Sequence, residues 1–350
     1  MRISLTNSNR SFSAAEDQSL LEAALQAGLK LPHGCRSGNC GSCRARLRQG
    51  SIRYPDGPPQ GLSAAEVADG QILLCKARAR GDLVLEQTEI RAAREVAVKR
   101  LPCRIESAER LAHDVLGLHL RLPSVEPLAF AAGQYVDVLL SRGRRRSFSI
   151  ASPPHAARLL ELHVRRVAGG EFTEHLFVRD PRGMLLSIEG PLGRFTIRPP
   201  EAVSSGATAE SSLPRPMLMV GGGTGLAPLQ SMLLDLIDKR SDREVTLYWG
   251  VRAERDLYAD TLLRKLAAAT PGLRYHPVLS EPSSTWAGRR GWVHAVVLAD
   301  LPSLAGHDIY AAGPPEMVAA VRAEFVAHGA DPTRLFCDSF DYASDAPARH

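Results

Sequence analysis

The stretch LPHGCRSGNCGSC, residues 31–43, decides how this chain is interpreted. It carries Cys35, Cys40 and Cys43 at C-x4-C-x2-C spacing, and Cys75 follows after a gap of 31 residues. Small, polar, turn-tolerant residues between the first two cysteines let the backbone wrap a buried inorganic core and turn N–H groups toward its sulfur atoms. One loop that supplies three thiolates, with a distant strand end that supplies the fourth, is typical of a [2Fe–2S] site.

Zinc sites and disulfides are the alternative uses of four such cysteines. Structural zinc sites usually come as two short pairs, such as C-x2-C and C-x2-C, whereas here three cysteines share one loop and the fourth stands alone. This split favours the iron–sulfur site, with Cys35, Cys40, Cys43 and Cys75 as the metal ligands. One such cluster carries one electron, so the rest of the chain is expected to supply that electron.

Length and composition narrow the class of protein. A chain of 350 residues favours two or three domains over one large core. No run of about 18 apolar residues is present, so no membrane span is expected, and the N-terminus lacks the basic start and apolar core of a signal peptide. The two remaining cysteines, Cys103 and Cys337, are expected to be free thiols in a reducing cytoplasm.

Basic residues gather around the predicted ligands, although the net charge of the whole chain is only +5. These residues are Arg36, Arg44, Arg46, Arg48, Lys76, Arg78 and Arg80. The alternation along CRARLR is also what the solvated face of a strand looks like. A basic collar beside a redox centre would favour an acidic face on a partner protein, whereas nucleic acid is not expected, because no aromatic interleaving accompanies the charge.

Three segments with different patterns follow one another. Residues 1–92 combine short strands with one or two helices, residues 99–200 read as successive strands, and residues 213–342 alternate strand and helix. The second pattern predicts a small antiparallel barrel, and the third a doubly wound parallel sheet. A linker, residues 92–100, and a polar low-complexity stretch, residues 201–212, separate the three.

Apolar periodicity and turn signals place the elements within these segments. The expected strands are residues 2–5, near 12, 82–86, 103–107, 115–122, 135–140, 146–150, 159–167, 217–220, 245–249, 273–278 and 308–310. The expected helices are residues 19–27, a short helix opened by a capping box of Ser63 and Glu66, and residues 174–178, 227–238, 258–269 and 315–328.

A glycine-rich turn, GGGTGLAP at residues 221–228, follows the first strand of the third segment and opens its first helix. Glycines let the backbone approach a pyrophosphate, and the helix N-terminus supplies partial positive charge. The turn is not G-x-G-x-x-G, and it lacks the lysine of a P-loop. Its place after a strand, in a chain with a redox cluster, makes it a candidate nicotinamide-nucleotide site.

The sequence RSFS, residues 146–149, ends a strand of the second segment. Its arginine can pair with phosphate, its aromatic ring can stack beside a flavin, and its serine can hydrogen-bond the flavin ring. Residues 169–173, GGEFT, precede a predicted helix, and their hydroxyl and open N–H groups could hold a second phosphate. That turn favours FAD over FMN.

The ordered motifs together make a family visible. The whole chain resembles the ferredoxin–NAD(P)H reductase superfamily, in the subgroup with an N-terminal plant-type ferredoxin domain; the order is ferredoxin, RSFS, GGEFT, GGGTGLAP, AAGPPEM and a C-terminal DSF. It is similar to reductase components of aromatic-ring-hydroxylating dioxygenases and related monooxygenases, and equally to CDP-6-deoxy-glucoseen reductases. The resemblance implies a β-grasp [2Fe–2S] domain, an antiparallel β-barrel FAD domain and a doubly wound parallel-sheet NAD(P) domain.

The resemblance also implies roles for individual residues. FAD would be bound by Arg146, Phe148, Ser149, Gly170 and Thr173. NAD(P)H would be bound by Gly221, Gly222, Gly223, Thr224, Gly225, Gly313 and Pro314, with Ser149 and Thr224 as the candidate catalytic residues. Two positions depart from the family pattern: Phe148 replaces a tyrosine, and Ala312 replaces a cysteine near the nicotinamide. We expect the second change to slow or alter hydride transfer but not to abolish it, because hydride transfer depends more on positioning than on that thiol.

The implied activity is electron transfer from NAD(P)H through FAD and the cluster to an acceptor protein. An oxygenase component, a Rieske ferredoxin or a dehydratase could be that acceptor, and the alternative of another class is a non-catalytic flavin and iron–sulfur sensor. A monomer is expected. NADH is expected to be preferred to NADPH, because Arg252 and Arg255 are opposed by Glu254 and Asp256 beyond the second strand of the third segment.

Overall fold

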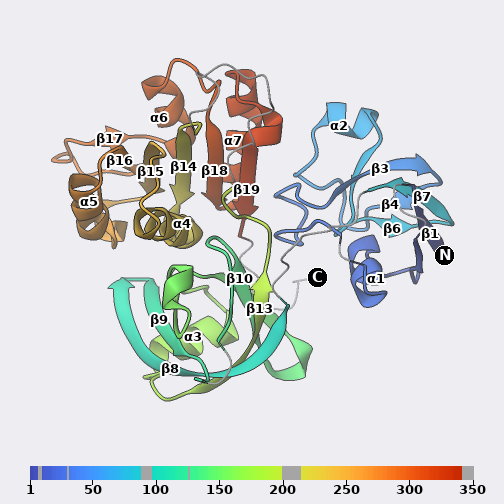
Figure 1. The fold of residues 1–350 in the computed structure, drawn as a ribbon, viewed down its shortest axis with the longest axis horizontal. Helices are drawn as coiled ribbons and strands as arrows, with labels where there is room; N and C mark the ends of the chain where they lie inside the picture. Colours follow the sequence, from blue (N-terminus) through green and yellow to red (C-terminus); the bar gives the residue numbers. More distant parts are fainter. Residues whose placement is uncertain (7–9, 30, 88–96, 125–126, 199–213, 341–350) are drawn as a thin grey trace. The chain divides into compact units, whose positions relative to one another are not determined.

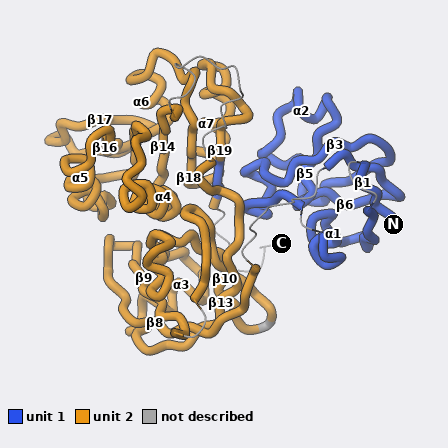
Figure 2. Tube along the Cα trace, viewed as in Figure 1, with its two compact units in different colours: residues 1–95, 337–339 blue, residues 96–336, 340–350 orange. Residues whose placement is uncertain are grey.

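The computed structural model describes six ranges of the chain, which are residues 1–6, 10–29, 31–87, 97–124, 127–198 and 214–340. The chain divides into two compact units (Figure 2). The first unit is Met1–Glu95 with Cys337–Ser339, and the second is Val96–Phe336 with Phe340–His350. The predicted low-complexity stretch 201–212 and most of the predicted linker 92–100 lie outside the described residues. Within these ranges, no helix has both the length and the apolar character needed to span a membrane.

The first unit is built on a five-stranded mixed sheet in the order β2-β1-β7-β3-β5, with a small β4-β6 pair beside it (Figure 1). Its elements are β1 (Arg2–Leu5), β2 (Ser11–Ser13), α1 (Leu20–Gln26), β3 (Arg44–Gln49), β4 (Ile52–Arg53), α2 (Ala64–Ala68), β5 (Gln71–Leu73), β6 (Arg78–Ala79) and β7 (Leu83–Glu86). Helix α1 begins after Ser19, whose hydroxyl accepts from the N–H of Glu22. The predicted capping box of Ser63 and Glu66 is confirmed at the start of α2.

The second unit begins with a six-stranded antiparallel sheet in the order β11-β10-β13-β8-β9-β12. A bridge between Ile150 and Leu162 joins its two edges, so the sheet closes into the predicted barrel. Its elements are β8 (Lys99–Ala112), β9 (Val115–Arg121), β10 (Tyr135–Leu139), η1 (Ser141–Gly143), β11 (Arg145–Ser149), η2 (Pro154–Ala156), β12 (Leu159–Arg165), α3 (Glu171–Val178) and β13 (Leu185–Leu192).

Residues 214–340 form an α/β fold whose sheet has the order β17-β16-β15-β14-β18-β19. Neighbouring strands from β17 to β18 run parallel, as the doubly wound pattern predicts. Its elements are β14 (Met217–Gly222), η4 (Gly223–Gly225), α4 (Leu226–Asp238), β15 (Val245–Val251), η5 (Glu254–Asp256), α5 (Asp260–Ala269), β16 (Leu273–Leu279), β17 (Arg289–Arg290), α6 (Val293–Asp300), β18 (Asp308–Gly313), α7 (Pro315–Ala327), η6 (Pro332–Arg334) and β19 (Leu335–Ser339).

The sheet order of this α/β part locates its ligand crevice. Strand β14 lies between β15 and β18, so the chain leaves β14 in one direction and later returns to its other side. Ligands of open α/β sheets bind at the carboxyl ends of strands where the order reverses in this way. The glycine-rich turn after β14 and the turn that follows β18 both lie at that position.

Helix α4 joins the α/β part to the barrel. Nearly all of its residues are buried, because it contacts β14 and β18 on one side and η2 of the barrel on the other. The hydroxyl of Ser231 on α4 donates to the carbonyl oxygen of Ser152 in the barrel at 2.7 Å. The barrel and the α/β part therefore share a packed polar and apolar contact within the second unit.

Candidate functional site

The four predicted metal ligands come from one loop and one strand end of the first unit. Cys35, Cys40 and Cys43 lie between α1 and β3, and Cys75 follows β5. The Sγ atoms of Cys43 and Cys75 lie 3.2 Å apart, while the N–H groups of Cys35 and Cys40 each donate to the other's sulfur at 3.3 Å. None of the four forms a disulfide. Two pairs of thiolates suit a cluster with two irons, so this donor set fits [2Fe–2S].

Missing side-chain volume shapes the loop around these sulfur atoms. A Cβ at Gly34 would lie 3.1 Å from Cys40 Sγ, and one at Gly61 would lie 2.6 Å from the carbonyl oxygen of Gly38. Arg36 has a φ of 59°, in the left-handed region that few residues other than glycine adopt. The tight winding brings backbone N–H groups to the sulfur atoms, as the turn-tolerant composition predicts.

The basic collar is partly neutralised in the structure. Four of its members form ion pairs, which are Arg44–Glu66, Arg46–Asp69, Arg48–Glu86 and Lys76–Asp56. Surface pairs of this kind leave the charges solvated and contribute little stability. The positive field near the cluster loop is therefore weaker than a count of its basic residues implies. Arg36, next to Cys35, is exposed.

Strand β11 places the RSFS motif at the edge of the barrel, paired with β10. The ring of Phe148 packs on Phe172 of α3, with centroids 6.0 Å apart. Burial, and then the nearby charge of Arg144, hold the pKa of Arg146 below its usual value, so an anion beside it would be stabilised. The hydroxyl of Ser149 is buried and has no hydrogen-bond partner among the described residues. A flavin ring atom would satisfy that hydroxyl, so these residues fit FAD.

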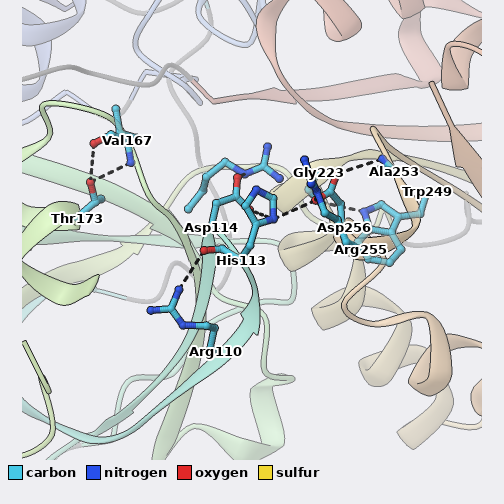
Figure 3. Close-up of polar contacts among 11 residues, drawn as sticks. Arg110, His113, Asp114, Val167, Thr173, Gly223, Trp249, Ala253, Arg255 and Asp256 are labelled. Atoms are coloured by element: carbon cyan, nitrogen blue, oxygen red, sulfur yellow. Dashed lines mark hydrogen bonds and ion pairs between the residues drawn. The ribbon is translucent and has the colours of Figure 1, made fainter. Parts of the chain in front are cut away.

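The predicted phosphate turn differs from expectation in one respect. Helix α3 begins at Glu171 and not at Glu174, so Thr173 lies in its first turn and Gly170 is the N-cap residue. The Thr173 hydroxyl is buried and accepts a hydrogen bond from the N–H of Val167 at 3.1 Å. The same hydroxyl lies 3.3 Å from the carbonyl oxygen of Val167 (Figure 3). The side chain thus holds the turn together, which leaves the helix N–H groups as the donors for a phosphate.

The glycine turn after β14 is packed against the end of β18. A Cβ at Gly225 would lie 2.0 Å from the carbonyl oxygen of Ala312, and one at Gly222 would lie 2.5 Å from Met317 Sδ. Gly221 lies within β14 and Thr224 is buried in the turn. Gly313 ends β18 and Pro314 caps α7. The structure therefore brings the predicted nicotinamide-nucleotide residues into one place, at the reversal of strand order.

A cavity of about 700 Å³ opens at this place. Gly222, Gly223 and Pro314 line it, together with Arg252 and Arg255 beyond the end of β15. A cavity of this size can bury most of a ligand as large as a dinucleotide half. Its position at the carboxyl ends of β14, β15 and β18 is the position predicted for NAD(P)H.

The barrel closes one side of the cavity through the turn between β8 and β9. His113 Nδ1 lies 3.3 Å from Asp256 Oδ1 of η5 and 3.8 Å from Asp114 Oδ1 (Figure 3). Arg165 Nε, on β12, lies 3.3 Å from Asp114 Oδ2. Asp256 is buried and also accepts from the N–H of Ala253 at 3.1 Å. These contacts bring barrel side chains to a site that sequence analysis assigned to the α/β part alone.

Sequence analysis did not single out Arg165, His113 or Trp292, which line the cavity. A signal for Arg165 was present, because polar residues alternate with Leu160, Leu162 and Val164 along β12. The indole of Trp292 is 68% exposed at the start of α6, an unusual setting for an unpaired large apolar ring. Neither residue belongs to a contiguous motif, which is why the spacing argument passed over both.

Three protein-family models match consecutive parts of the chain. The 2Fe-2S iron-sulfur cluster binding domain matches residues 3–80, the oxidoreductase FAD-binding domain matches residues 102–197, and the oxidoreductase NAD-binding domain matches residues 219–323. These matches confirm the predicted cofactors, a [2Fe–2S] cluster, FAD and NAD(P)H, and the predicted class of NAD(P)H-dependent oxidoreductase.

Similar proteins share the full length of the chain. The CDP-6-deoxy-L-threo-D-glycero-4-hexulose-3-dehydrase reductase of Yersinia pestis is 35% identical over 97% of this chain and 98% of its own. The reductase subunit of an Amycolatopsis aromatic O-demethylase is 35% identical over 98% of this chain and 100% of its own. The crystal structure of Amycolatopsis cytochrome P450 reductase GcoB covers 97% of this chain and 98% of its own, at 35% identity and a TM-score of 0.74.

Removal of one cluster ligand is expected to separate the two redox functions. Cys40→Ser should lose most of the [2Fe–2S] absorbance, because the cluster needs four thiolates, while FAD stays bound in the other unit. The variant should still reduce ferricyanide from NAD(P)H, since that dye can take electrons from flavin. Absorbance spectra and dye assays check both points, and Cys103→Ser, at a buried thiol whose pKa burial raises to about 12, is the control. Loss of both activities in Cys40→Ser would contradict independent domains.

Loss of the proposed phosphate partner is expected to release flavin. Arg146→Ala removes a charge-assisted hydrogen bond, so FAD should bind about tenfold to a hundredfold more weakly. The flavin-to-protein ratio after gel filtration measures the loss. Arg145→Ala is the matched control, because Arg145 pairs with Glu189 and Asp137 instead. Full FAD occupancy in Arg146→Ala would show that this arginine is wrongly assigned.

Proposed function

We propose a function from one premise: the chain belongs to the family of oxidoreductases that join a [2Fe–2S] ferredoxin-type domain to FAD-binding and NAD-binding domains. It passes electrons from NAD(P)H through FAD and the cluster to an acceptor protein. We infer that this acceptor is an oxygenase component or the Rieske-type ferredoxin that serves one. The observation that carries the proposal is the combination, in one chain, of sites for two-electron carriers with a site for a one-electron carrier.

The proposal assigns three domains and their residues. Residues 1–92 hold the cluster, residues 99–200 hold FAD and residues 213–342 hold the nicotinamide nucleotide. FAD held in this way would supply two-electron chemistry with NAD(P)H, and a cluster held by the four cysteines would supply one-electron chemistry. In this assignment the hydroxyl of Ser149 would donate a hydrogen bond to the flavin ring. Thr224 lies where the nicotinamide would meet the glycine turn.

The residues around these sites would only position the cofactors and balance their charge. No side chain needs to act as an acid or base in hydride transfer. Arg146 and the N-terminus of α3 would neutralise the FAD phosphates. Gly222 and Gly223 line the cavity and would let the nucleotide approach the backbone, since they carry no side chain. Gly225 lets the turn pack against β18, because a Cβ there would collide with the carbonyl oxygen of Ala312.

Charge in the cavity supports NADH as the preferred donor. Arg252 and Arg255 line it, but the buried carboxylate of Asp256 and Glu281 at the end of β16 line it as well. Glu254 is turned away, because it accepts from the N–H of Ser283 at 3.2 Å. A 2′-phosphate would meet two carboxylates in addition to the two arginines, whereas a free ribose can hydrogen-bond to carboxylates.

A second acceptor is favoured by a specific observation. The Yersinia pestis relative, a dehydrase reductase, is as similar to this chain as the aromatic O-demethylase subunit is. The acceptor could therefore be a dehydratase that also takes electrons one at a time. Both candidates require a protein that docks near the cluster loop, and the basic residues there suit an acidic face.

Nucleotide choice is tested by steady-state kinetics with a dye acceptor. We expect a higher kcat/KM with NADH than with NADPH, since a 2′-phosphate would be repelled by Asp256 and Glu281. Arg252→Ala should change kcat/KM for both nucleotides by the same factor. A tenfold preference for NADPH, lost selectively in Arg252→Ala or Arg255→Ala, would show that these arginines form a phosphate clamp.

Acceptor docking is tested with an acidic Rieske-type ferredoxin as the electron acceptor. NADH-dependent reduction of this ferredoxin should slow as ionic strength rises, because salt screens attraction between opposite charges. Arg36→Glu should lower kcat/KM for the ferredoxin several-fold while ferricyanide reduction is unchanged. Arg182→Glu, at an exposed arginine paired with Asp180 in the barrel, is the control. No reduction of the ferredoxin by the wild-type protein, with ferricyanide activity intact, would favour the dehydratase.

A further inference from the structure

One face of strand β12 carries three polar side chains that the proposed electron transfer does not use. Along the strand, Leu160, Leu162 and Val164 are buried in the barrel core, and Glu161 and His163 alternate with them. Alternate residues of a strand point to opposite faces. The polar face, which Arg165 continues, therefore points out of the barrel core, and Tyr258 and Gln230 of the α/β part contact it.

A chain of hydrogen bonds leads from this face into the α/β part. The hydroxyl of Tyr258 lies 3.1 Å from His163 Nδ1, and His163 Nε2 lies 3.1 Å from Glu161 Oε1. Burial is the largest single influence on the pKa of Glu161 and raises it. The hydrogen bond from His163 and the electrostatic attraction of His163 and His119 together outweigh burial, so the pKa lies below the usual value. A charged Glu161 needs a donor, so His163 Nε2 carries a proton, and Nδ1 faces the hydroxyl of Tyr258.

This series of contacts continues from Tyr258 to the glycine turn. The ring of Tyr258 meets Trp249 edge to face, with centroids 5.0 Å apart and an interplanar angle of 76°. Trp249 is fully buried, and its Nε1–H donates to the carbonyl oxygen of Gly223 at 2.9 Å (Figure 3). A Cβ at Gly223 would lie 3.1 Å from the guanidinium of Arg165. Barrel side chains thus reach Gly223 directly through Arg165 and indirectly through Trp249.

This contact helps to orient one peptide group, together with the backbone N–H of Leu226, which also donates to the carbonyl oxygen of Gly223. Gly223 has a φ of +54°, and a glycine can change its backbone conformation at little cost. In a planar trans peptide the C=O and N–H bonds point in opposite directions. The bond from Trp249 to the carbonyl of Gly223 therefore turns the N–H of Thr224 away from Trp249. A second bond, from Gln230 Nε2 on α4 to Glu161 Oε2 at 3.4 Å, ties the following helix to the same carboxylate.

We propose that His163 is a positioning residue for the dinucleotide: with Glu161, Tyr258 and Trp249 it fixes the glycine turn in the conformation that binds the diphosphate of the nicotinamide nucleotide. This inference rests on the proposed nucleotide site. The alternative is that the same contacts only hold the barrel and the α/β part together. The two ideas differ in what they predict for nucleotide affinity at unchanged flavin content.

The test measures NAD⁺ binding to the full-length holoprotein by calorimetry. Tyr258→Phe keeps the ring and removes only the hydroxyl that reaches His163, so NAD⁺ should bind about three- to tenfold more weakly while FAD stays bound. Tyr248→Phe is the matched control. Tyr248 directly precedes Trp249 on β15, and its hydroxyl donates to Asp300 at 2.9 Å within the α/β part. NAD⁺ affinity should be unchanged in Tyr248→Phe even where its melting temperature falls.

Variants of His163 test the direction of the hydrogen bonds. His163→Asn keeps an acceptor for Tyr258, whereas His163→Leu removes it, so His163→Asn should bind NAD⁺ more tightly than His163→Leu. Adding Tyr258→Phe to His163→Leu should cause little further loss, because both changes break one chain of contacts. Hydrogen exchange at the amides of the glycine turn should quicken in Tyr258→Phe and not in Tyr248→Phe.

The outcomes separate this inference from the function on which it rests. If the wild-type protein binds NAD⁺ and Tyr258→Phe binds it equally well, only the positioning role is overturned. If both tyrosine variants lower the melting temperature and neither changes NAD⁺ affinity, the contacts are structural and the inference is likewise wrong. If the wild-type protein binds no NAD⁺, the nucleotide site itself has been misassigned, and both conclusions fail.

Discussion

The close approach of two strand ends, β14 and β18, is the constraint on which the rest of the second unit depends. There is room for no side chain at Gly225, where a Cβ would stand 2.0 Å from a carbonyl oxygen of β18. Gly222 and Gly313 face similar crowding from Met317 of α7. Because these backbones touch, helix α4 starts directly after the glycine turn, whose Gly222 and Gly223 line the cavity. Sheet order, cavity position and helix direction all follow from that contact.

The chemistry of the site was readable because each piece of it is contiguous in sequence. The cysteine loop, the RSFS strand end and the glycine turn each occupy a few neighbouring residues, and each has a spacing that only a few functions require. The contact between Tyr258 and His163 joins residues 95 positions apart. No local pattern predicts such a pair, because it exists only after the barrel and the α/β part have packed together.

Two elements that were not predicted, and two that were predicted with other bounds, differ from the prediction for identifiable reasons. Strand β13 contains Gly190 and Pro191, residues that argue against a strand when the sequence is read alone. Helix α6 is apolar on most sides and so lacks the period of 3.6 that marks a surface helix. Strand β8 runs well beyond the predicted residues 103–107, because its charged second half pairs through the backbone with β9. Helix α3 begins three residues early, since Glu171 can occupy a first turn as well as a loop can.

Strand β12 contributes to two sets of contacts, and both limit which parts of the protein can be exchanged with those of a relative. Its apolar positions complete the barrel core, while its polar positions contact the α/β part. A chimaera that combined this barrel with the α/β part of a relative would keep the first set of contacts and break the second. Exchange of modules should therefore succeed when the barrel and the α/β part are exchanged as one piece. The ferredoxin-type part is a compact unit with its own core, so it can be replaced separately. Evolution by domain shuffling would meet the same boundary.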